Sequence, residues 1–180
     1  MRIIAGKYRH RLINYPENNP LIRPTKDRVR EAIYSSLGDI SNKVVLDLFA
    51  GSGAMGIEAL SRNAKECHFV DINDLAIKVV KDNIKSLGID NGYIYHMDYA
   101  VAMKHFVEKG LVFDIIILDP PYASDKYIKI IEDIMNMSLL SDKGVIVVEN
   151  NSSFNYDDFA FNKVKRYHYG KSNVDILWRN

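Results

Sequence analysis

The sequence predicts an α/β domain built on a mostly parallel β-sheet that helices cover on both faces. From residue 43 onward, short apolar runs rich in β-branched residues alternate with longer segments of helical periodicity. One of these runs, residues 44–53 (VVLDLFAGSG), leads through a glycine turn into a helical pattern. With 180 residues, 47% apolar and 26% charged, the chain can bury the core of one domain and is short for two.

Ahead of the sheet we expect a small extension made of a hairpin and a helix. Residues 2–15 mix apolar and basic side chains around Gly6, which predicts a short hairpin. Thr25 is suited to cap the N-terminus of the helix that follows, and Gly38 is suited to end it. The predicted organisation is therefore an N-terminal extension at 1–40 and the main domain at 41–180.

The alternating segments predict the remaining elements in order. Strands are expected near 43–48, 66–71, 92–97, 113–118 and 144–149. Helices are expected near 54–62, 73–87, 99–109 and 125–137. The tail predicts two further strands, antiparallel to each other because their link is short, at 161–169 and 173–179.

The glycine turn is the first candidate ligand site. Glycine at 51 and 53 permits a tight turn and lets a ligand approach the backbone. Together with Gly56 the spacing fits G-x-G-x-x-G, so a nicotinamide or flavin dinucleotide is one candidate ligand. The charge of Asp47 disfavours a pyrophosphate and favours a cationic ligand such as S-adenosylmethionine, which carries a sulfonium and an ammonium. The alternative is a strand-to-helix turn without a ligand.

Four of the predicted strands end in an acidic residue or lead into one, namely Asp47, Asp71, Asp98 and Asp119. In an open parallel sheet the ligand lies beyond the carboxyl ends of the strands, so these residues indicate a shared ligand edge. Asp71 comes 24 residues after Asp47, at a position suited to accept hydrogen bonds from ribose hydroxyls. For each aspartate the alternative is a helix N-cap.

The run Asp119-Pro120-Pro121-Tyr122 directly after a buried strand is the second candidate site. The prolines stiffen the loop and leave carbonyl oxygens free to accept hydrogen bonds. Asp119 and the Pro120 carbonyl are suited to accept the two N–H bonds of an exocyclic amine, while Tyr122 stacks on the base. The alternative is a plain turn.

The charge of +1 is unevenly divided along the chain. Residues 1–30 carry eight Lys/Arg against two acidic residues, a local charge of +6, and residues 31–180 carry a local charge of −5. A basic segment on a mildly acidic body is typical of a nucleic-acid contact, with a solvated terminus as the alternative. The candidate RNA contacts are Lys7, Arg9, Arg11, Arg23, Lys26 and Arg30.

Other residue types narrow the class of protein. No apolar stretch approaches the ~20 residues of a membrane span, and the first residues are too briefly apolar for a signal peptide, so we expect a cytoplasmic protein without a membrane partner. The single cysteine, Cys67, is expected to be a buried strand residue. The five histidines lack paired metal-ligand spacing, so no metal is expected. The sequence implies no particular oligomer.

The two motifs at 47–53 and 119–122 resemble those of class I S-adenosylmethionine-dependent methyltransferases that modify amino groups of bases. Further motifs narrow the resemblance to the bacterial RsmD family, which methylates guanine N2 in 16S ribosomal RNA. These are residues 2–9 (RIIAGKYR), 23–25 (RPT) with 27–32 (DRVREA), and 56–62 (GIEALSR).

The resemblance implies a Rossmann-like seven-strand class I methyltransferase sheet with an N-terminal extension that contacts RNA. It also implies that ribosomal RNA or the assembling small ribosomal subunit is the partner. It assigns Asp47, Gly51 and Gly53 to the methionine part of S-adenosylmethionine, Asp71 to its ribose, and Asp98 with Tyr99 to its adenine. Phe49 and Ile72 complete the cofactor-binding set, and the catalytic set is Asp119, Pro120, Pro121 and Tyr122.

Two residues depart from the family pattern. His10 stands where a small residue, often glycine, is expected in the hairpin, and Asp71 stands where glutamate is common. Histidine at position 10 concerns the RNA contact. Aspartate at position 71 keeps the carboxylate that glutamate would supply.

The expected reaction is a direct in-line attack of the guanine N2 lone pair on the cofactor methyl, without a covalent enzyme intermediate. The rival readings are an adenine-N6 or cytosine-N4 nucleic-acid methyltransferase, a non-catalytic RNA- or ribosome-binding protein on the same fold, and a dehydrogenase.

Overall fold

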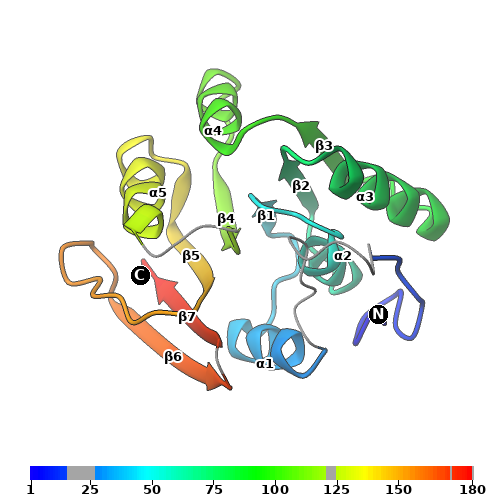
Figure 1. Cartoon of the computed structure of the whole chain (residues 1–180), viewed down its shortest axis with the longest axis horizontal. Coiled ribbons are helices and arrows are strands. Elements are labelled where there is room, and N and C mark those ends of the chain that lie inside the picture. The colour runs from blue at the N-terminus through cyan, green and yellow to red at the C-terminus, as the bar shows by residue number, and fades with distance from the viewer. Residues whose placement is uncertain (16–26, 121–124, 171, 180) are drawn as a thin grey trace.

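A seven-stranded sheet runs through the computed structural model, which describes residues 1–15, 27–120, 125–170 and 172–179 (Figure 1). Its strands are β1 (Val44–Asp47), β2 (Glu66–Asp71), β3 (Gly92–His96), β4 (Phe113–Leu118), β5 (Leu140–Asn150), β6 (Lys163–Tyr169) and β7 (Ser172–Trp178). Their order across the sheet is β3-β2-β1-β4-β5-β7-β6. Strands β1 to β5 pair in parallel, and β7 lies antiparallel to both of its neighbours.

Helices cover both faces of this sheet. They are α1 (Asp27–Leu37), α2 (Ala54–Ser61), α3 (Asp74–Leu87), α4 (Tyr99–Glu108) and α5 (Asp125–Asn136). Figure 1 shows α4 and α5 on one side of the sheet and α1, α2 and α3 on the other. Successive strand residues face opposite sides, so Val45 packs in the cluster under α1 to α3 whereas Leu46 packs in the cluster under α4 and α5.

The predicted α/β fold class is confirmed. Every predicted strand and helix after residue 43 is present within a few residues of its expected bounds, and the two tail strands are antiparallel as expected. Strand β5 begins earlier than predicted because Leu140 pairs with Phe113 ahead of a register shift in β4. Gly38 follows α1 as predicted, with φ +71° and its N–H donating to the Tyr34 carbonyl. Thr25 lies outside the described residues.

Helix α2 packs unusually close to β2 because its third residue is glycine. A Cβ at Gly56 would lie 2.3 Å from Cε1 of Phe69 and 2.6 Å from Sγ of Cys67. Cys67 is fully buried on β2, as predicted. The close approach fixes the start of α2, and therefore the end of the glycine turn, against the sheet.

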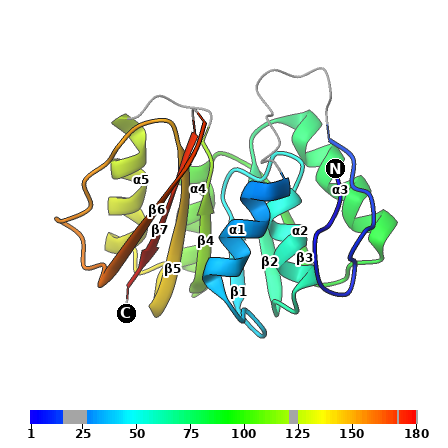
Figure 2. The ribbon, with the colours of Figure 1, turned by 90° about the horizontal axis from the view of Figure 1, so that it is seen from below.

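Residues 1–15, here named the N-terminal arm, form a hairpin-like loop rather than two paired strands. Its two sides meet in a single antiparallel bridge between Arg2 and Leu12. Ile3 and Ile13 are 2% and 3% exposed and belong to the core cluster on the α1 side of the sheet. Figure 2 shows the arm running alongside α2 and α3. The arm is therefore part of the packed molecule, and its hydrogen bonds reach the helices that flank the glycine turn.

Candidate functional site

The structure places the four predicted aspartates at one edge of the sheet. Asp47 is level with Phe69 of β2 and with Ile117 of β4. Asp71 and Asp119 therefore lie two residues further along the strands on either side. Asp71 is in turn level with His96, so Asp98 lies two residues beyond it. The carboxyl ends of β1 to β4 thus carry a row of acidic residues beside the glycine turn. This row, here named the acidic rim, consists of Asp47, Asp71, Asp98 and Asp119.

The glycine turn is held by backbone hydrogen bonds on both sides. The Leu48 N–H donates to the Ile117 carbonyl at 3.1 Å, and the Ala50 N–H donates to the Val70 carbonyl at 2.9 Å. Gly51 and Gly53 have φ of +55° and +79°, in the left-handed region that glycine adopts without strain. The turn therefore needs glycine at both positions, as the sequence predicted.

Asp71 anchors this turn through its carboxylate. Its Oδ2 accepts a 2.8 Å hydrogen bond from the Gly51 N–H, and its Oδ1 accepts one of 2.9 Å from the Asn73 N–H. The N-cap of α3 is Asn73, whose side chain accepts from two backbone N–H groups of the first turn. The alternative reading of Asp71 as a helix cap is therefore wrong, and its carboxylate borders the loop.

Asp47 is a buried acid without a cation among its described contacts. It is 3% exposed, and its Oδ2 accepts a 3.1 Å hydrogen bond from the Gly56 N–H. Burial raises the pKa of Asp47 from 3.8 to about 7; the Gly56 N–H opposes this rise, and the charge of Asp71 adds to it. The ionised form is costly here, so a cationic ligand at this position would be stabilised.

Asp119 lies in a similarly acidic environment at the end of β4. Desolvation raises its pKa well above the ordinary value, and the carboxylates of Glu149 and Asp47 raise it further. The Tyr127 hydroxyl of α5 donates to the Glu149 carbonyl at 2.9 Å and to the Pro120 carbonyl at 3.3 Å. Pro121 and Tyr122, the other members of the predicted catalytic set, lie outside the described residues.

Glu149 was not among the predicted site residues. It lies near the end of β5, next to Val148, which pairs with Leu118 of β4, so it is beside Asp119 at the same sheet edge. Its signal was available, because Glu149 closes an apolar run just as the four aspartates do. The acidic rim therefore extends across five strands.

Aromatic rings border the glycine turn on the β3 side. The rings of Phe49 and Tyr99 lie with their centroids 5.4 Å apart. Asp98 caps α4 by accepting a 2.8 Å hydrogen bond from the Ala100 N–H, which is the alternative that the sequence left open for it. Ile72 is 62% exposed. The residues assigned to the adenine side thus gather near one another, with an exposed apolar side chain next to Asp71.

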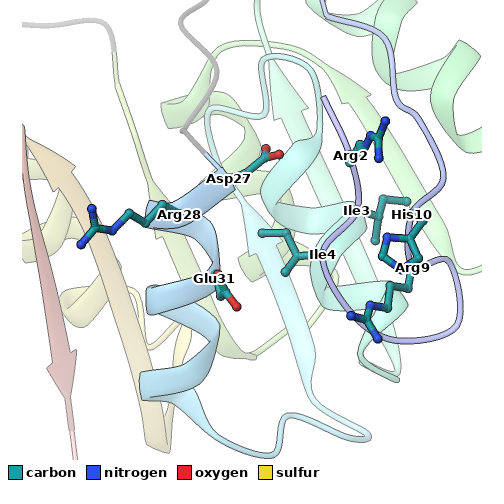
Figure 3. Close-up of a pocket in the computed structure, with 8 residues that line it drawn as sticks. All are labelled: Arg2, Ile3, Ile4, Arg9, His10, Asp27, Arg28 and Glu31. Atoms are coloured by element: carbon teal, nitrogen blue, oxygen red, sulfur yellow. The ribbon is translucent and has the colours of Figure 1, made fainter.

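A second feature is an open hollow of about 350 Å³ between the N-terminal arm and α1 (Figure 3). Figure 3 shows Arg2, Arg9 and His10 on the arm, across the hollow from Asp27 and Glu31 on α1. His10 has φ +68°, which explains why glycine suits this position. The residues that line the hollow are Arg2, Ile3, Ile4, Arg9, His10, Asp27, Arg28 and Glu31.

Three of the six predicted RNA contacts lie exposed on the arm, namely Lys7, Arg9 and Arg11. Arg11 also donates to the Ser86 carbonyl of α3 at 3.2 Å. Arg23 and Lys26 lie outside the described residues.

The prediction that Arg30 contacts RNA is wrong. Its side chain is fully buried and pairs with Glu58 at 3.5 Å and with Asp27 at 3.1 Å. It also donates to the Arg2 carbonyl of the arm. A guanidinium enclosed in this way has no path to a phosphate, so Arg30 has a structural role.

Glu58 of α2 is the partner that explains the burial of Arg30. It is itself fully buried, and its carboxylate accepts from the N–H groups of Ile4 and Ala5 at 2.9 and 3.1 Å. The Nε of Arg62 also donates to Oε1 of Glu58, at 2.9 Å. Glu58 was not among the predicted site residues, although a lone acid inside the apolar helical run at 56–60 is a signal for a buried, paired charge.

Among the residues that the structure describes, no three His, Cys, Asp or Glu side chains gather as metal ligands would. No helix in the described ranges is long and apolar enough to cross a membrane.

Comparison with known proteins places this architecture in a family. A family model described as "Conserved hypothetical protein 95" matches residues 1–178. The chain belongs to this family. It is the RsmD family that the sequence motifs resemble, so that prediction is confirmed.

Named relatives of the chain cover most of its length. "Putative rRNA methyltransferase YlbH" of Bacillus subtilis is 37% identical over 152 residues, which are 83% of this chain and 82% of the relative. "Ribosomal RNA small subunit methyltransferase D" of Escherichia coli K12 is 33% identical over 151 residues, covering 83% of this chain and 74% of the relative.

A solved structure shares the whole fold. "Putative methyltransferase yhhF from Escherichia coli" superposes with a TM-score of 0.87 at 28% identity, covering 100% of this chain and 98% of that one. The seven-strand class I methyltransferase sheet is therefore the fold of this chain, as predicted.

Proposed function

We propose that this protein transfers a methyl group from S-adenosylmethionine to the exocyclic N2 of a guanine in small-subunit ribosomal RNA. The observation that carries the proposal is the acidic rim, in which Asp47 and Asp119 share one sheet edge and desolvation raises the pKa of both carboxyls. The related rRNA methyltransferases support ribosomal RNA as the substrate. The motif resemblance supports guanine N2.

The chemistry of the donor set fits S-adenosylmethionine. When bound, this cofactor supplies a methyl group that is electrophilic because it is attached to a positively charged sulfur. Asp47 would hold the cationic methionine part, and the backbone at Gly51 and Gly53 would approach it without a Cβ in the way. Asp71 and Ile72 would border the ribose, with Asp98, Tyr99 and Phe49 near the adenine.

The target amine would be positioned by Asp119 and Pro120. A guanine N2 lone pair is delocalised into the ring, so it becomes nucleophilic only when acceptors favour a pyramidal nitrogen. The Asp119 carboxyl and the Pro120 carbonyl supply two such acceptors at the end of β4. Pro121 and Tyr122 complete this proposed catalytic set.

The RNA is proposed to lie across the N-terminal arm and the hollow beside α1. Lys7, Arg9 and Arg11 are exposed on the arm. Arg2 and His10 are among the residues that line the hollow (Figure 3). Arg23 and Lys26 remain proposed contacts from the sequence. The division into an RNA-binding extension at 1–40 and a methyltransferase domain at 41–180 belongs to the same proposal.

The decisive experiment is methyl transfer from tritiated S-adenosylmethionine to unmodified small-subunit rRNA, free and in assembled particles. Digestion of the product to nucleosides is expected to yield labelled N2-methylguanosine. Labelled N6-methyladenosine or N4-methylcytidine would show that the target base is adenine or cytosine instead of guanine. The absence of labelling on both substrates would refute the proposed activity.

Asp119→Asn tests the site itself. This variant is expected to lose about 10²-fold or more in turnover while its affinity for S-adenosylhomocysteine changes little, because the amine acceptor lies on another strand from the glycine turn. The matched control is Asp142→Asn, since the Asp142 side chain is 97% exposed on β5. Lost cofactor affinity with retained turnover at saturation would place Asp119 in the cofactor pocket instead.

A further inference from the structure

We propose that Asn83 is a positioning residue that joins the N-terminal arm to the glycine turn, so that RNA on the arm and cofactor on the turn bind cooperatively. The inference rests on the proposed function and adds to it an energetic coupling between the two ligands. Its basis is one buried amide on α3 that hydrogen-bonds to both segments.

The contacts of Asn83 are few and complete. Its Nδ2 donates to the Ser52 carbonyl at 3.0 Å and to the Asn14 carbonyl at 2.9 Å. Its Oδ1 accepts a 2.8 Å hydrogen bond from the Asn14 N–H. The side chain is fully buried, so water offers no substitute for a lost partner. One planar amide therefore satisfies both backbone groups of Asn14 and one carbonyl of the turn.

On the turn, Asn83 acts at the point where a cofactor would lie. Ser52 stands between Gly51 and Gly53, and the Gly51 N–H is already fixed by Asp71 at 2.8 Å. Asp71 and Asn83 thus hold neighbouring backbone groups of the turn from β2 and from α3. The path of this glycine-rich backbone sets how closely a ligand can approach. Losing the hydrogen bond from Gly51 to Asp71, or the one from Asn83 to Ser52, would therefore change cofactor affinity.

On the arm, Asn83 acts at its last described turn. Asn14 directly follows Ile13, which is buried in the core, and Arg11 also contacts α3 at the Ser86 carbonyl. If the arm shifts away from α3, the buried amide of Asn83 loses two of its three hydrogen bonds. Its remaining contact with Ser52 is then no longer held in one orientation. A ligand that favours the docked arm therefore also favours the ordered turn.

This arrangement implies a reciprocal effect between the two ligands. RNA that stabilises the docked arm should tighten cofactor binding, and cofactor should tighten RNA binding by the same factor. We expect a coupling factor of about 5 or more, the lower end of typical values. A purely structural asparagine would give the same affinity for cofactor with and without RNA.

The measurement is the dissociation constant of S-adenosylhomocysteine by calorimetry, with and without saturating small-subunit rRNA, on the full chain. Asn14→Pro removes the N–H that Asn83 accepts while leaving the contact between Asn83 and Ser52 in place. Asn14→Ala keeps that N–H and is the matched control, because the Asn14 side chain is exposed. We expect Asn14→Pro to bring the coupling factor close to one and Asn14→Ala to leave it unchanged.

A second pair of variants tests the asparagine itself. Asn83→Asp keeps the acceptor for the Asn14 N–H but removes the donor to the Ser52 and Asn14 carbonyls, so it should lower cofactor affinity and also remove the coupling. Asn91→Asp is its control, because the Nδ2 of Asn91 donates at 2.8 Å to the Lys65 carbonyl, away from the arm and the turn. That variant should retain the coupling factor of the unaltered protein.

The outcomes separate the inference from the proposed function. Methyl transfer with a coupling factor of one in the unaltered protein would overturn the coupling and leave the function standing. Equal coupling in Asn14→Pro and Asn14→Ala would overturn the role of the Asn14 contact. Failure of the unaltered protein both to bind S-adenosylhomocysteine and to methylate RNA would overturn the proposed function, and the coupling with it.

Discussion

At the scale of single residues, the ionisation of Asp47 links ligand binding to stability. An acid whose pKa is raised from 3.8 to about 7 in the folded protein holds a proton there that the unfolded chain has already lost. Stability contributed by that proton is complete below pH 3.8 and is lost as the pH rises through about 7. Ionisation of the buried Asp47 carboxyl therefore lowers the stability of the ligand-free protein at neutral pH.

Asp47→Asn is expected to be more stable than the unaltered protein without ligand, by an amount that grows between pH 4 and pH 7. The limiting slope is about 1.4 kcal/mol per pH unit, because one proton is involved. Asparagine keeps an acceptor for the Gly56 N–H and carries no charge. Urea unfolding at several pH values measures the difference, and a difference that stays constant with pH would contradict the assignment.

The same carboxylate predicts how cofactor affinity changes with pH. A cation beside Asp47 favours its ionised form, so binding S-adenosylmethionine must displace a proton below the pKa of about 7. Affinity should rise from pH 5.5 to pH 7 by at most about tenfold per unit. Calorimetry across this range provides the test. Asp47→Asn should bind weakly with a flat profile, and an equally steep profile in that variant would assign the proton to another group.

Gly6 predicts a steric effect at the contact between the arm and α2. Its φ is +83°, and a Cβ would lie 1.7 Å from the Ser61 carbonyl oxygen. Gly6→Ala should therefore cost roughly 2 to 4 kcal/mol of unfolding free energy, from backbone strain and a clash with backbone.

Gly110→Ala is the matched control for that substitution. Gly110 has φ +66° and nothing within 4 Å of the added Cβ, so only the strain of about 1 kcal/mol applies. Chemical unfolding of both variants separates the clash from the strain. Equal losses in the two would show that the arm moves away from Ser61 without cost.

At the scale of elements, the ion pairs of Glu58 hold the arm, α1 and α2 together. Arg30→Ala would leave Glu58 buried with one cation fewer, and the loss of one partner of a buried pair typically costs about 3 to 5 kcal/mol. Arg28→Ala on the same helix is the control, because Arg28 is exposed and should change stability by less than about 0.5 kcal/mol. Thermal unfolding compares the two. Similar melting temperatures would show that Glu58 is satisfied without Arg30.

The elements could be predicted from the sequence to the extent that their signals are local. Alternation of apolar runs with helical periodicity located the strands, and the parallel sheet then placed Asp47, Asp71 and Asp119 at one edge. The burial of Arg30 had a local signal too, because Arg30 shares the helical face of Ile33, Tyr34 and Leu37.

The partners of these buried polar residues could not be predicted in the same way. Glu58 lies 54 residues from Ile4, and Asn83 lies 69 residues from Asn14. Helical spacing shows that Asn83 shares the apolar face of Val80, Ile84 and Leu87, but it does not show which backbone groups will meet it. Those contacts depend on how the arm packs across α2 and α3, which one sequence does not specify.

At the scale of the whole molecule, the acidic residues of the rim and the basic residues of the arm lie in two separate regions, for which we expect different ligands. The acidic rim lies at the carboxyl edge of the sheet, whereas the arm, whose Lys and Arg side chains are exposed, runs beside α2 and α3 (Figure 2). Contacts between cations and phosphates release counterions, so they give an RNA affinity that falls with salt and depends little on sequence. The arm should therefore control RNA affinity, and its effect on cofactor should pass through the contacts of Asn83.

Replacing Arg2, Lys7 and Arg9 together by alanine tests this division. All three are exposed on the arm, and none is a member of the Glu58 cluster through its side chain. The slope of log affinity against log salt should fall by up to about three if each contacts a phosphate. Affinity for S-adenosylhomocysteine without RNA should stay unchanged, because the contacts between Asn14, Asn83 and Ser52 are retained.

The control for that variant removes the same charge elsewhere. Lys104, Lys109 and Lys143 are exposed and lie away from the arm, so their replacement by alanine lowers the net charge equally. If the general charge of the molecule attracted the RNA, both triple variants would lose the same slope. A loss confined to the arm variant assigns the phosphate contacts to the arm, and a reduced cofactor affinity in that variant without RNA would instead show that these side chains shape the glycine turn directly.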